Sequence, residues 1–389
     1  MMNKEIESRY GLIGNNLELK ENVSLVVNKD GKILKIRYDN PKKNIELTPN
    51  TQNFLMIPGF INSHTHIVDS FAKEMGFNKD LIEIVAPPDG LKHILLRDTS
   101  KEIKFRGIKN AILEMLSNGT TFFIDFRERG IEGINLLKVS LKKFPLNYLI
   151  FGRYTDAKEI ETIFKEADGI GLSSYKNISV SIKERLQYFK SKLKKPIACH
   201  DAELKRDETL LKEIINDDLI DVIVHGTHYT KEDLQLIKNK KISLVLCPRS
   251  NGYFGVGFPP ITEILRLQIP ISLGTDNVMA NNTDLFEELR YLYRISRVLG
   301  RNDEIVKLDT KELLKMITIN AARNFDLEKN RGSITEGKVA DILLIDLNDP
   351  NFYSFKVDSN NIFPLIVQRA KSENIKRVYI KGELAFERN

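Results

Sequence analysis

The stretch Gly59–Ser70 reads GFINSHTHIVDS and follows the apolar run Phe54–Ile57. His64 and His66 are separated by a single residue. Residues i and i+2 of a β-strand face the same side, so both imidazoles are predicted to point towards one place at the end of one strand. Two convergent imidazoles suit a divalent metal such as zinc, although two hydrogen-bonded core histidines would show the same spacing.

Short apolar runs and amphipathic stretches alternate from about residue 55 to residue 330. Several of the amphipathic stretches begin with Thr, Ser or Asp, as capped helices do. This alternation predicts a parallel sheet, and eight apolar runs predict a closed (β/α)₈ TIM barrel. The predicted strands are Phe54–Ile61, Thr121–Phe126, Tyr148–Gly152, Gly169–Leu172, Pro196–His200, Asp221–His225, Ile242–Cys247 and Ile271–Leu273. The predicted helices are Lys101–Leu116, Ile182–Leu193, Thr209–Ile215, Lys231–Ile237 and Leu285–Leu299.

The two ends of the chain do not fit the barrel pattern, because both carry short strand-like segments. We expect them to pair into one small β-sandwich-like domain. The predicted organisation is residues 1–53 for the first part of that domain, 54–332 for the barrel and 333–389 for the second part. The strand-like segments are Val23–Val27, Ile33–Ile36, Ala340–Ile345 and Val378–Ile380.

The composition narrows the class of protein and the compartment. No apolar run approaches the ~20 residues that span a bilayer, so no membrane partner is expected. Lysine and glutamate are interspersed and the net charge is only +6, so nucleic acid is not an expected partner either. The N-terminus shows no apolar signal sequence, and Cys199 and Cys247 are too few for a disulfide framework. We expect a cytoplasmic protein that acts on a small molecule and forms a homo-oligomer, the common default.

The first histidine pair has counterparts at the ends of other predicted strands. His200 ends the fifth strand in PIACHDAE, His225 ends the sixth in DVIVHGTH, and Asp276 follows the eighth in ISLGTDN. Active sites of barrel enzymes lie at the C-terminal ends of the strands. Four of the chain's six histidines occur at such positions, which favours a metal-dependent active site over scattered core histidines.

These motifs resemble those of the amidohydrolase superfamily, and most closely its mononuclear deaminase branch, which includes cytosine, guanine and S-adenosylhomocysteine deaminases. The resemblance covers nearly the whole chain. The matching segments are MIPGFINSHTH, CHDAE, VHGTH, LCPRSN, LGTDNVMANN and TINAARNFDLEKNRGSITEGKVADILLID. It implies a metal-dependent hydrolase on a TIM barrel.

The resemblance also implies a ligand set for the metal. His64, His66, His200 and Asp276 would hold one divalent metal per subunit and leave a position open for water. Zinc is the expected metal, while Fe²⁺, Mn²⁺ and Co²⁺ suit the same ligands. Asp276 would also accept the proton of the water; its alternative role is a turn or helix cap.

Two further residues acquire catalytic roles from the resemblance. Glu203 would protonate the ring nitrogen beside the leaving amine and pass a proton to the departing ammonia. His225 would hydrogen-bond and orient the attacking water. The alternatives are a surface glutamate for Glu203 and a ligand to a second metal for His225. The predicted fourth strand, GIGLSS, offers neither the lysine nor the glutamate of binuclear relatives, which favours one metal.

Substrate selection is expected to depend on the first loop and on polar residues near the ends of the second and third strands. The first-loop tryptophan and the fourth-strand histidine of the nucleoside deaminases are both missing, which argues against a standard adenosine-type substrate. Arg127 or Arg129 after the second strand and Arg153 after the third would bind an acidic group or pair with neighbouring carboxylates. His93, Lys92 and Arg97 in the first loop are further candidates. The principal candidate substrate contacts are His228, Arg127, Arg153, His93 and Asn251.

The sequence thus predicts an aminohydrolase that removes the exocyclic amine of a heteroaromatic ring, such as a purine, pyrimidine or pterin base or nucleoside, and releases ammonia. One alternative is a cyclic-amide hydrolase of the same superfamily, similar to imidazolonepropionase. Another is a barrel that binds a metal without catalysis.

Overall fold

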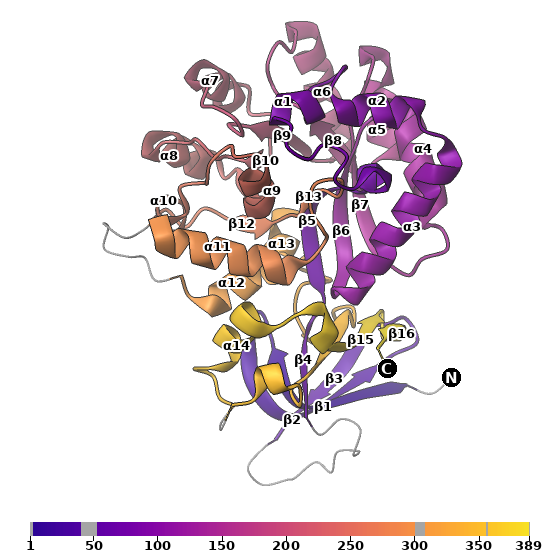
Figure 1. Cartoon of the computed structure of the whole chain (residues 1–389), viewed down its shortest axis with the longest axis vertical. Coiled ribbons are helices and arrows are strands. Elements are labelled where there is room, and N and C mark those ends of the chain that lie inside the picture. The colour runs from indigo at the N-terminus through magenta and orange to yellow at the C-terminus, as the bar shows by residue number, and fades with distance from the viewer. Residues whose placement is uncertain (1–2, 40–52, 300–307, 355–356, 389) are drawn as a thin grey trace.

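A computed structural model of the chain describes residues 3–39, 53–299, 308–354 and 357–388. Its larger part is a barrel of parallel strands surrounded by helices, and its smaller part is a β domain at the N-terminal end of the barrel (Figure 1). The predicted fold class is therefore confirmed. The predicted first segment, 1–53, includes residues 40–52, which lie outside the described residues.

The barrel has eight strand positions, and the eighth is shared by two short strands. β12 bonds to β11, whereas β13 bonds to β5 through the pairs Asp276–Thr65 and Asn277–His66, which closes the ring. The first two strands are buried along their whole length, as expected for strands covered on both faces. The barrel strands are β5 (Phe60–His66), β6 (Thr120–Arg127), β7 (Asn147–Gly152), β8 (Gly169–Leu172), β9 (Ile197–Asp201), β10 (Val222–His225), β11 (Ser243–Leu246), β12 (Ile271–Leu273) and β13 (Asp276–Asn277).

Helices form the outer layer of the barrel and cover its mouth. The predicted capped starts are confirmed at Ser100, Ser179, Asp207 and Thr230, whose side chains each accept a hydrogen bond from the first turn of a helix. The helices of this layer are α1 (Leu81–Val85), α2 (Leu91–Asp98), α3 (Lys101–Ser117), α4 (Gly130–Leu141), α5 (Ile160–Glu166), α6 (Val180–Leu193), α7 (Glu208–Asp217), α8 (Lys231–Lys240), α9 (Pro248–Tyr253), α10 (Ile261–Arg266), α11 (Leu285–Leu299), α12 (Thr310–Met316) and α13 (Ile319–Asn324).

The small domain is one seven-stranded sheet built from both ends of the chain. It curls until the turn at Gly31 meets the far end of the sheet, where Ala340 N donates to Gly31 O and Gly382 N donates to Ala340 O. Apolar side chains such as Leu25 and Leu344 fill the space between the two halves. Its elements are β1 (Lys4–Ile13), β2 (Glu18–Val27), β3 (Ile33–Arg37), β4 (Phe54–Pro58), β14 (Ile342–Asp346), α14 (Ile362–Arg369), β15 (Ile375–Ile380) and β16 (Glu383–Glu387).

The run Phe54–Ile61, predicted as one barrel strand, is in fact two strands in different sheets. β4 pairs with β1 and β14 of the small domain, and β5 begins the barrel. The exchange takes place within two residues, since Gly59 N donates to Asp341 O and Phe60 N donates to Gly119 O. A side chain at position 59 would collide with Thr121, so glycine is required at the crossing. The start of the barrel is therefore nearer residue 60 than residue 54.

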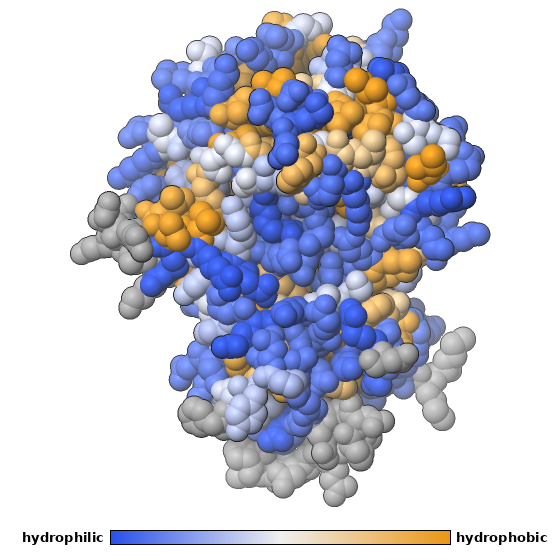
Figure 2. All heavy atoms as spheres, viewed as in Figure 1, coloured by the Kyte–Doolittle hydropathy of each residue, from blue (hydrophilic) through white to orange (hydrophobic). Residues whose placement is uncertain are grey.

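The surface seen from the side of Figure 1 is mostly hydrophilic, with separate apolar patches (Figure 2). None of the helices in the described ranges is long and apolar enough to cross a membrane.

Candidate metal centre

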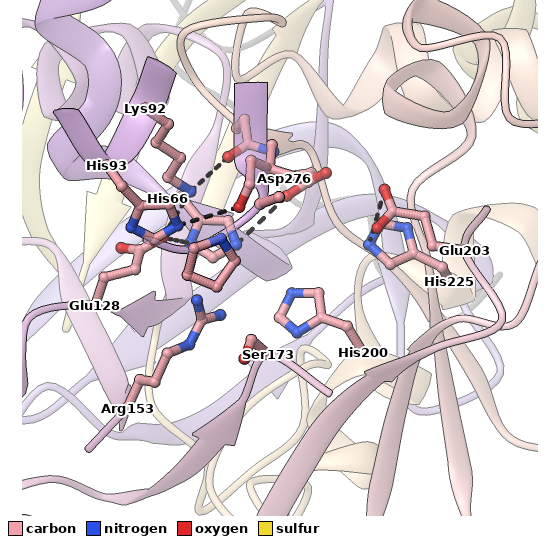
Figure 3. A pocket seen from close by; sticks show the side chains of 14 residues that line it. His66, Lys92, His93, Glu128, Arg153, Ser173, His200, Glu203, His225 and Asp276 are labelled. Atoms are coloured by element: carbon pink, nitrogen blue, oxygen red, sulfur yellow. Dashed lines mark hydrogen bonds and ion pairs between the residues drawn. The ribbon is translucent and has the colours of Figure 1, made fainter. Parts of the chain in front are cut away.

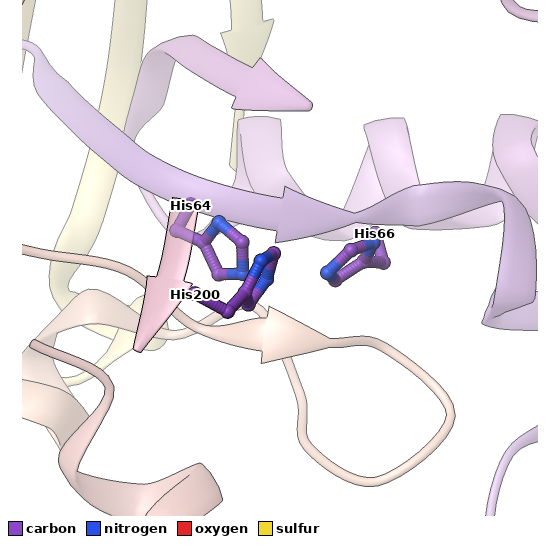
Figure 4. Close-up of side chains that lie close together, drawn as sticks. All are labelled: His64, His66 and His200. Atoms are coloured by element: carbon purple, nitrogen blue, oxygen red, sulfur yellow. The ribbon is translucent and has the colours of Figure 1, made fainter. Parts of the chain in front are cut away.

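Four side chains meet at the C-terminal mouth of the barrel. His64 and His66 come from β5, His200 from β9 and Asp276 from β13. The ring centroids of His64 and His66 and those of His64 and His200 are both 4.9 Å apart. One ring nitrogen from each of His64, His66 and His200 lies within 4.8 Å of the others (Figure 4). Single ligand atoms of His64, His225 and Asp276 lie equally close together. The structure thus brings together the predicted ligand residues.

Unsatisfied donor atoms make this cluster fit a metal ion. Neither ring nitrogen of the fully buried His64 has a hydrogen-bond partner among the described residues. Buried polar atoms are normally paired, so two orphaned nitrogens on one ring require an explanation. Asp276 Oδ1 lies 3.2 Å from His64 Nε2 and 3.5 Å from His66 Nε2, which leaves a carboxylate oxygen facing the imidazoles. A divalent cation between these atoms would bind one nitrogen of each imidazole together with Asp276 Oδ1.

Neighbouring groups fix the orientation of the candidate ligands. His200 Nδ1 lies 2.9 Å from Leu172 O, so this nitrogen carries the proton and Nε2 is free to bind. Ser250 Oγ donates to Asp276 Oδ2 at 2.6 Å and leaves Oδ1 available. His66 Nδ1 lies 2.8 Å from Glu128 Oε1. Such supporting contacts set the tautomer and rotation of metal-binding side chains.

The electrostatics of the cluster also favour metal binding. Burial lowers the pKa of His64 and of His200, and it lowers the pKa of His66 to about 3. Neutral imidazoles are the form that binds a metal. Burial acts to raise the pKa of Asp276, but contact with His64 outweighs it and holds that pKa well below its usual range. The cluster therefore offers three neutral nitrogen ligands and one carboxylate.

Glu203 and His225 lie side by side on the wall of the same cavity. Glu203 Oε1 is 3.5 Å from His225 Nε2, and burial raises the pKa of Glu203. His225 Nδ1 lies 3.1 Å from Asn251 Oδ1, and Asn251 Nδ2 donates to Thr227 Oγ1 at 3.0 Å. The amide orientation of Asn251 therefore makes Nδ1 of His225 a donor and leaves its Nε2 free to face the cavity.

Two of these residues have strained backbones. His225 has a φ of +76° and Asp276 a φ of +60°, in the left-handed region that side chains other than glycine rarely adopt. Such strain costs about 1–3 kcal/mol per residue and persists only where the surroundings impose it. Here Asn251 and Ser250 hold the two side chains in place. The surrounding hydrogen bonds thus impose the placement of both side chains.

A cavity of about 200 Å³ opens above the cluster (Figure 3). Val85 at the end of α1 and the loop residues Ala86 and Pro87 give it one apolar wall, whereas the other walls are polar. His93, a predicted substrate contact, lies in this wall with Nε2 3.1 Å from Val85 O. The polar lining residues are His66, Lys92, His93, Glu128, Arg153, Ser173, His200, Glu203, His225, Asp276 and Asn277.

The other predicted substrate contacts are placed differently. Arg127 is 1% exposed, forms ion pairs with Asp125 and Glu128, and does not line the cavity. His228 also lies outside the lining, and its Nε2 is 2.7 Å from Val256 O. Asn251 is buried behind His225. Arg153 alone of the two arginines faces the cavity.

Two further residues border the candidate metal ligands: Lys92, which the sequence offered as a first-loop candidate, and Glu128, which the sequence reasoning did not place there. Lys92 is 3% exposed, and its Nζ lies 2.6 Å from both Glu128 Oε1 and Asn277 Oδ1. Glu128 thereby joins His66 to Lys92 and Arg127. The only sequence signal for Glu128 at this site was its position in DFRERG, directly after the second strand.

Comparison with known protein sequences identifies the family of the chain. The sequence model of the amidohydrolase family matches residues 55–385, and the chain belongs to that family. It is 35% identical to an uncharacterized protein of Methanocaldococcus jannaschii, over 82% of this chain and 85% of the relative. It is 28% identical to a 5-methylthioadenosine/S-adenosylhomocysteine deaminase of Thermoanaerobacter pseudethanolicus, over 95% of this chain and 90% of the relative.

Solved structures share the fold across nearly the whole chain. A guanine deaminase from C. acetobutylicum, solved with guanine, superposes with a TM-score of 0.80 at 20% identity and covers 99% of this chain and 100% of its own. An adenosine deaminase from Xanthomonas campestris, solved with zinc, has a TM-score of 0.80 at 19% identity and covers 98% of this chain and 92% of its own. At these identities the likeness establishes the fold alone.

Proposed function

We propose that the chain is a metal-dependent aminohydrolase that replaces the exocyclic amine of a heteroaromatic ring by oxygen and releases ammonia. The observation that carries the proposal is the position of Glu203 and His225 on the wall of a cavity that is also lined by His66, His200 and Asp276, with His64 buried beneath them. The relatives named as deaminases support the same chemistry.

One divalent metal per subunit would be held by His64, His66, His200 and Asp276. Zinc is our choice, because it favours imidazole and carboxylate ligands and because a structural neighbour carries it. When bound, such a metal supplies hydroxide at neutral pH by lowering the pKa of water.

Glu203 is the proposed proton carrier. Burial raises its pKa, so its carboxyl group holds a proton more readily than an exposed glutamate. It would give that proton to the ring nitrogen beside the C–NH₂ carbon as water adds to that carbon. Glu203 would then accept the hydroxyl proton of the added water and pass it to the amine as the C–N bond breaks, so that the amine leaves as ammonia. The proton held by Asp276 would restore the acid form of Glu203. Acid–base help of this kind contributes typically ~10²–10⁴-fold.

His225 and Asp276 would position the water. His225 Nε2 is turned towards Glu203 because Asn251 fixes the opposite ring nitrogen. The free oxygen of Asp276 faces the histidines, where it can take up the proton that water loses. Both groups are held by neighbours before substrate arrives, so little reorganisation is needed during reaction.

The cavity supports a flat, partly polar substrate. Its apolar wall of Val85, Ala86 and Pro87 suits the face of an aromatic ring, and its polar walls suit ring nitrogens and carbonyls. The proposed class comprises amino-substituted purines, pyrimidines and pterins, as free bases or nucleosides.

The test is ammonia release by the zinc-loaded protein from a panel of these compounds, with mass analysis of each product. Deamination replaces an amine by oxygen and yields one ammonia per product. A product that has gained a whole water with no ammonia would overturn the proposal in favour of ring opening. Glu203→Gln is the control, because it keeps the shape of the side chain and removes its acid.

A further inference from the structure

A second cavity, of about 590 Å³, adjoins the cavity above the metal cluster. The two share Pro87, His93, Glu128, Arg153 and Ser173, so a ligand in one can extend into the other. We call this second cavity the outer chamber; it lies over the ends of β6, β7 and β8. Its remaining polar lining residues are Arg97, Arg129, Tyr154, Thr155, Ser174, Lys176 and Asn177.

The outer chamber is strongly positive. Four cationic side chains line it, those of Arg97, Arg129, Arg153 and Lys176, against the single carboxylate of Glu128. That carboxylate is already engaged by groups outside the chamber, because Lys92 lies 2.6 Å from its Oε1 and Arg127 pairs with its Oε2. These contacts offset much of its charge, although the carboxylate still attracts Arg153.

Protein groups compensate the charge of Arg153 only weakly. In the described part of the chain it forms no ion pair, and its one hydrogen bond runs from Nε to Gly171 O at 3.4 Å. Figure 3 shows its guanidinium group pointing into the cavity. Burial lowers the pKa of Arg153, which reflects the cost of keeping this charge away from water. A guanidinium whose terminal nitrogens are free is suited to bind an oxyanion through two parallel hydrogen bonds.

The other cations lie where they would complete an anion site. Lys176 is exposed and forms no ion pair within the described residues. Arg97 and Arg129 pair with Asp98 and Glu132, but both partners are more than half exposed, so these pairs are weak.

We propose that the outer chamber binds a phosphate monoester carried by the substrate, with Arg153 as its main contact and Lys176 at its rim. The inference rests on the proposed deaminase function, since it concerns the part of the substrate beyond the reacting ring. The excess of several positive charges favours a phosphate monoester, which carries about −1.5 to −2 at neutral pH, over a singly charged carboxylate. The hydroxyl groups of Ser173 and Ser174 add donors for its three oxygens.

The experiment is titration of the zinc-loaded protein with inorganic phosphate by calorimetry, repeated on protein stripped of zinc. Phosphate held by the outer chamber binds both forms, whereas phosphate held by zinc binds only the loaded form. Glutarate is titrated in parallel as the carboxylate probe. This arm needs no turnover, so it reports on the subsite even if the proposed deamination fails.

Arg153→Gln should weaken phosphate binding by about tenfold to a hundredfold, the loss expected for one charge-assisted contact. Lys176→Gln, an exposed position that tolerates change, should weaken it about two- to fivefold. Arg266→Gln on α10, outside the chamber, is the matched control and should change it by less than about twofold. Circular dichroism and zinc content check that each variant is folded.

A second arm uses turnover. For any compound that releases ammonia, the ratio of kcat/KM for its phosphorylated form to that for its unphosphorylated form should exceed ten and should fall in Arg153→Gln. The proposal is overturned if phosphate binds only in the presence of zinc, if it binds equally to wild type and to both chamber variants, if no phosphate binding is measurable, or if glutarate binds more tightly than phosphate.

Discussion

Nδ1 of His66 lies 2.8 Å from Oε1 of Glu128, so a candidate metal ligand is anchored by a carboxylate that Lys92 and Arg127 also contact. Although burial alone would raise it, the neighbouring cations and imidazole hold the pKa of Glu128 well below its usual range. An ionised carboxylate at this position keeps the proton on Nδ1 and turns Nε2 towards Asp276.

Glu128→Gln should therefore weaken zinc binding, by about 10- to 100-fold, because the ring of His66 loses its charged anchor. Competition with a chromophoric chelator measures this affinity. Glu132→Gln, which removes an exposed carboxylate on α4, is the control. Unchanged zinc affinity in a folded Glu128→Gln protein would show that the contact has no part in metal binding.

Asn251→Leu should lower kcat by about 10- to 100-fold while zinc content stays at the wild-type level. The reason is that His225 Nδ1 would lose its acceptor and the ring could turn away from Glu203. Asn251→Asp keeps an acceptor oxygen and should recover part of the rate. Loss of zinc in the leucine variant would instead place His225 and Asn251 in support of the metal.

Gly274→Ala should disrupt the metal centre by steric pressure on His64. A Cβ at position 274 would lie 2.5 Å from His64 Cβ and 2.7 Å from its backbone nitrogen. Overpacking of this kind costs about 1–3 kcal/mol, and the shift would fall on β5. Zinc content and thermal unfolding measure the effect. Gly337 has a φ of +86°, which alanine rarely adopts, but a Cβ there would meet nothing within 4 Å. Gly337→Ala should therefore strain the backbone without loss of zinc.

The stability of the protein should depend on pH through Asp284, at the start of α11. Burial, with help from Glu287, raises the pKa of Asp284 to about 6. A raised carboxyl pKa contributes stability that is complete below its unfolded value of about 3.9 and is lost as the pH rises through about 6.

Asp284→Asn removes this titration. Relative to wild type, the variant should gain up to about 3 kcal/mol in free energy of unfolding between about pH 4 and pH 8. Urea denaturation at both pH values measures the change. A difference between variant and wild type that stays constant over this range would contradict the assignment.

The grouping of the candidate metal ligands was largely predictable because it depends on short-range rules. Alternation along a strand places His64 and His66 on one side, and the strand ends of a barrel converge. The strand exchange at Gly59 was not predictable from the unbroken apolar run Phe54–Ile61, since apolarity does not say which sheet a residue joins.

The roles of the two arginines depended on which face of a strand each residue occupies. Phe126 fills the interior of the barrel, so its neighbour Arg127 falls on the opposite face and pairs there with Asp125. Arg153 comes just after β7 ends and turns into the cavity. The contact of Lys92 with Glu128 joins helix α2 to the loop after β6, and no local sequence pattern encodes a contact between residues so far apart in the chain.

The most direct test of the account is ammonia release measured as zinc is added stepwise to metal-free protein, in the presence of a compound from the aminopurine, aminopyrimidine and pterin panel. Our account predicts that release rises in proportion to zinc and stops at about one equivalent per chain, as expected for a single site with three histidines and one carboxylate. His200→Gln should show neither tight zinc binding nor release. Full activity without metal, or no ammonia from any compound with the site fully loaded, would contradict it.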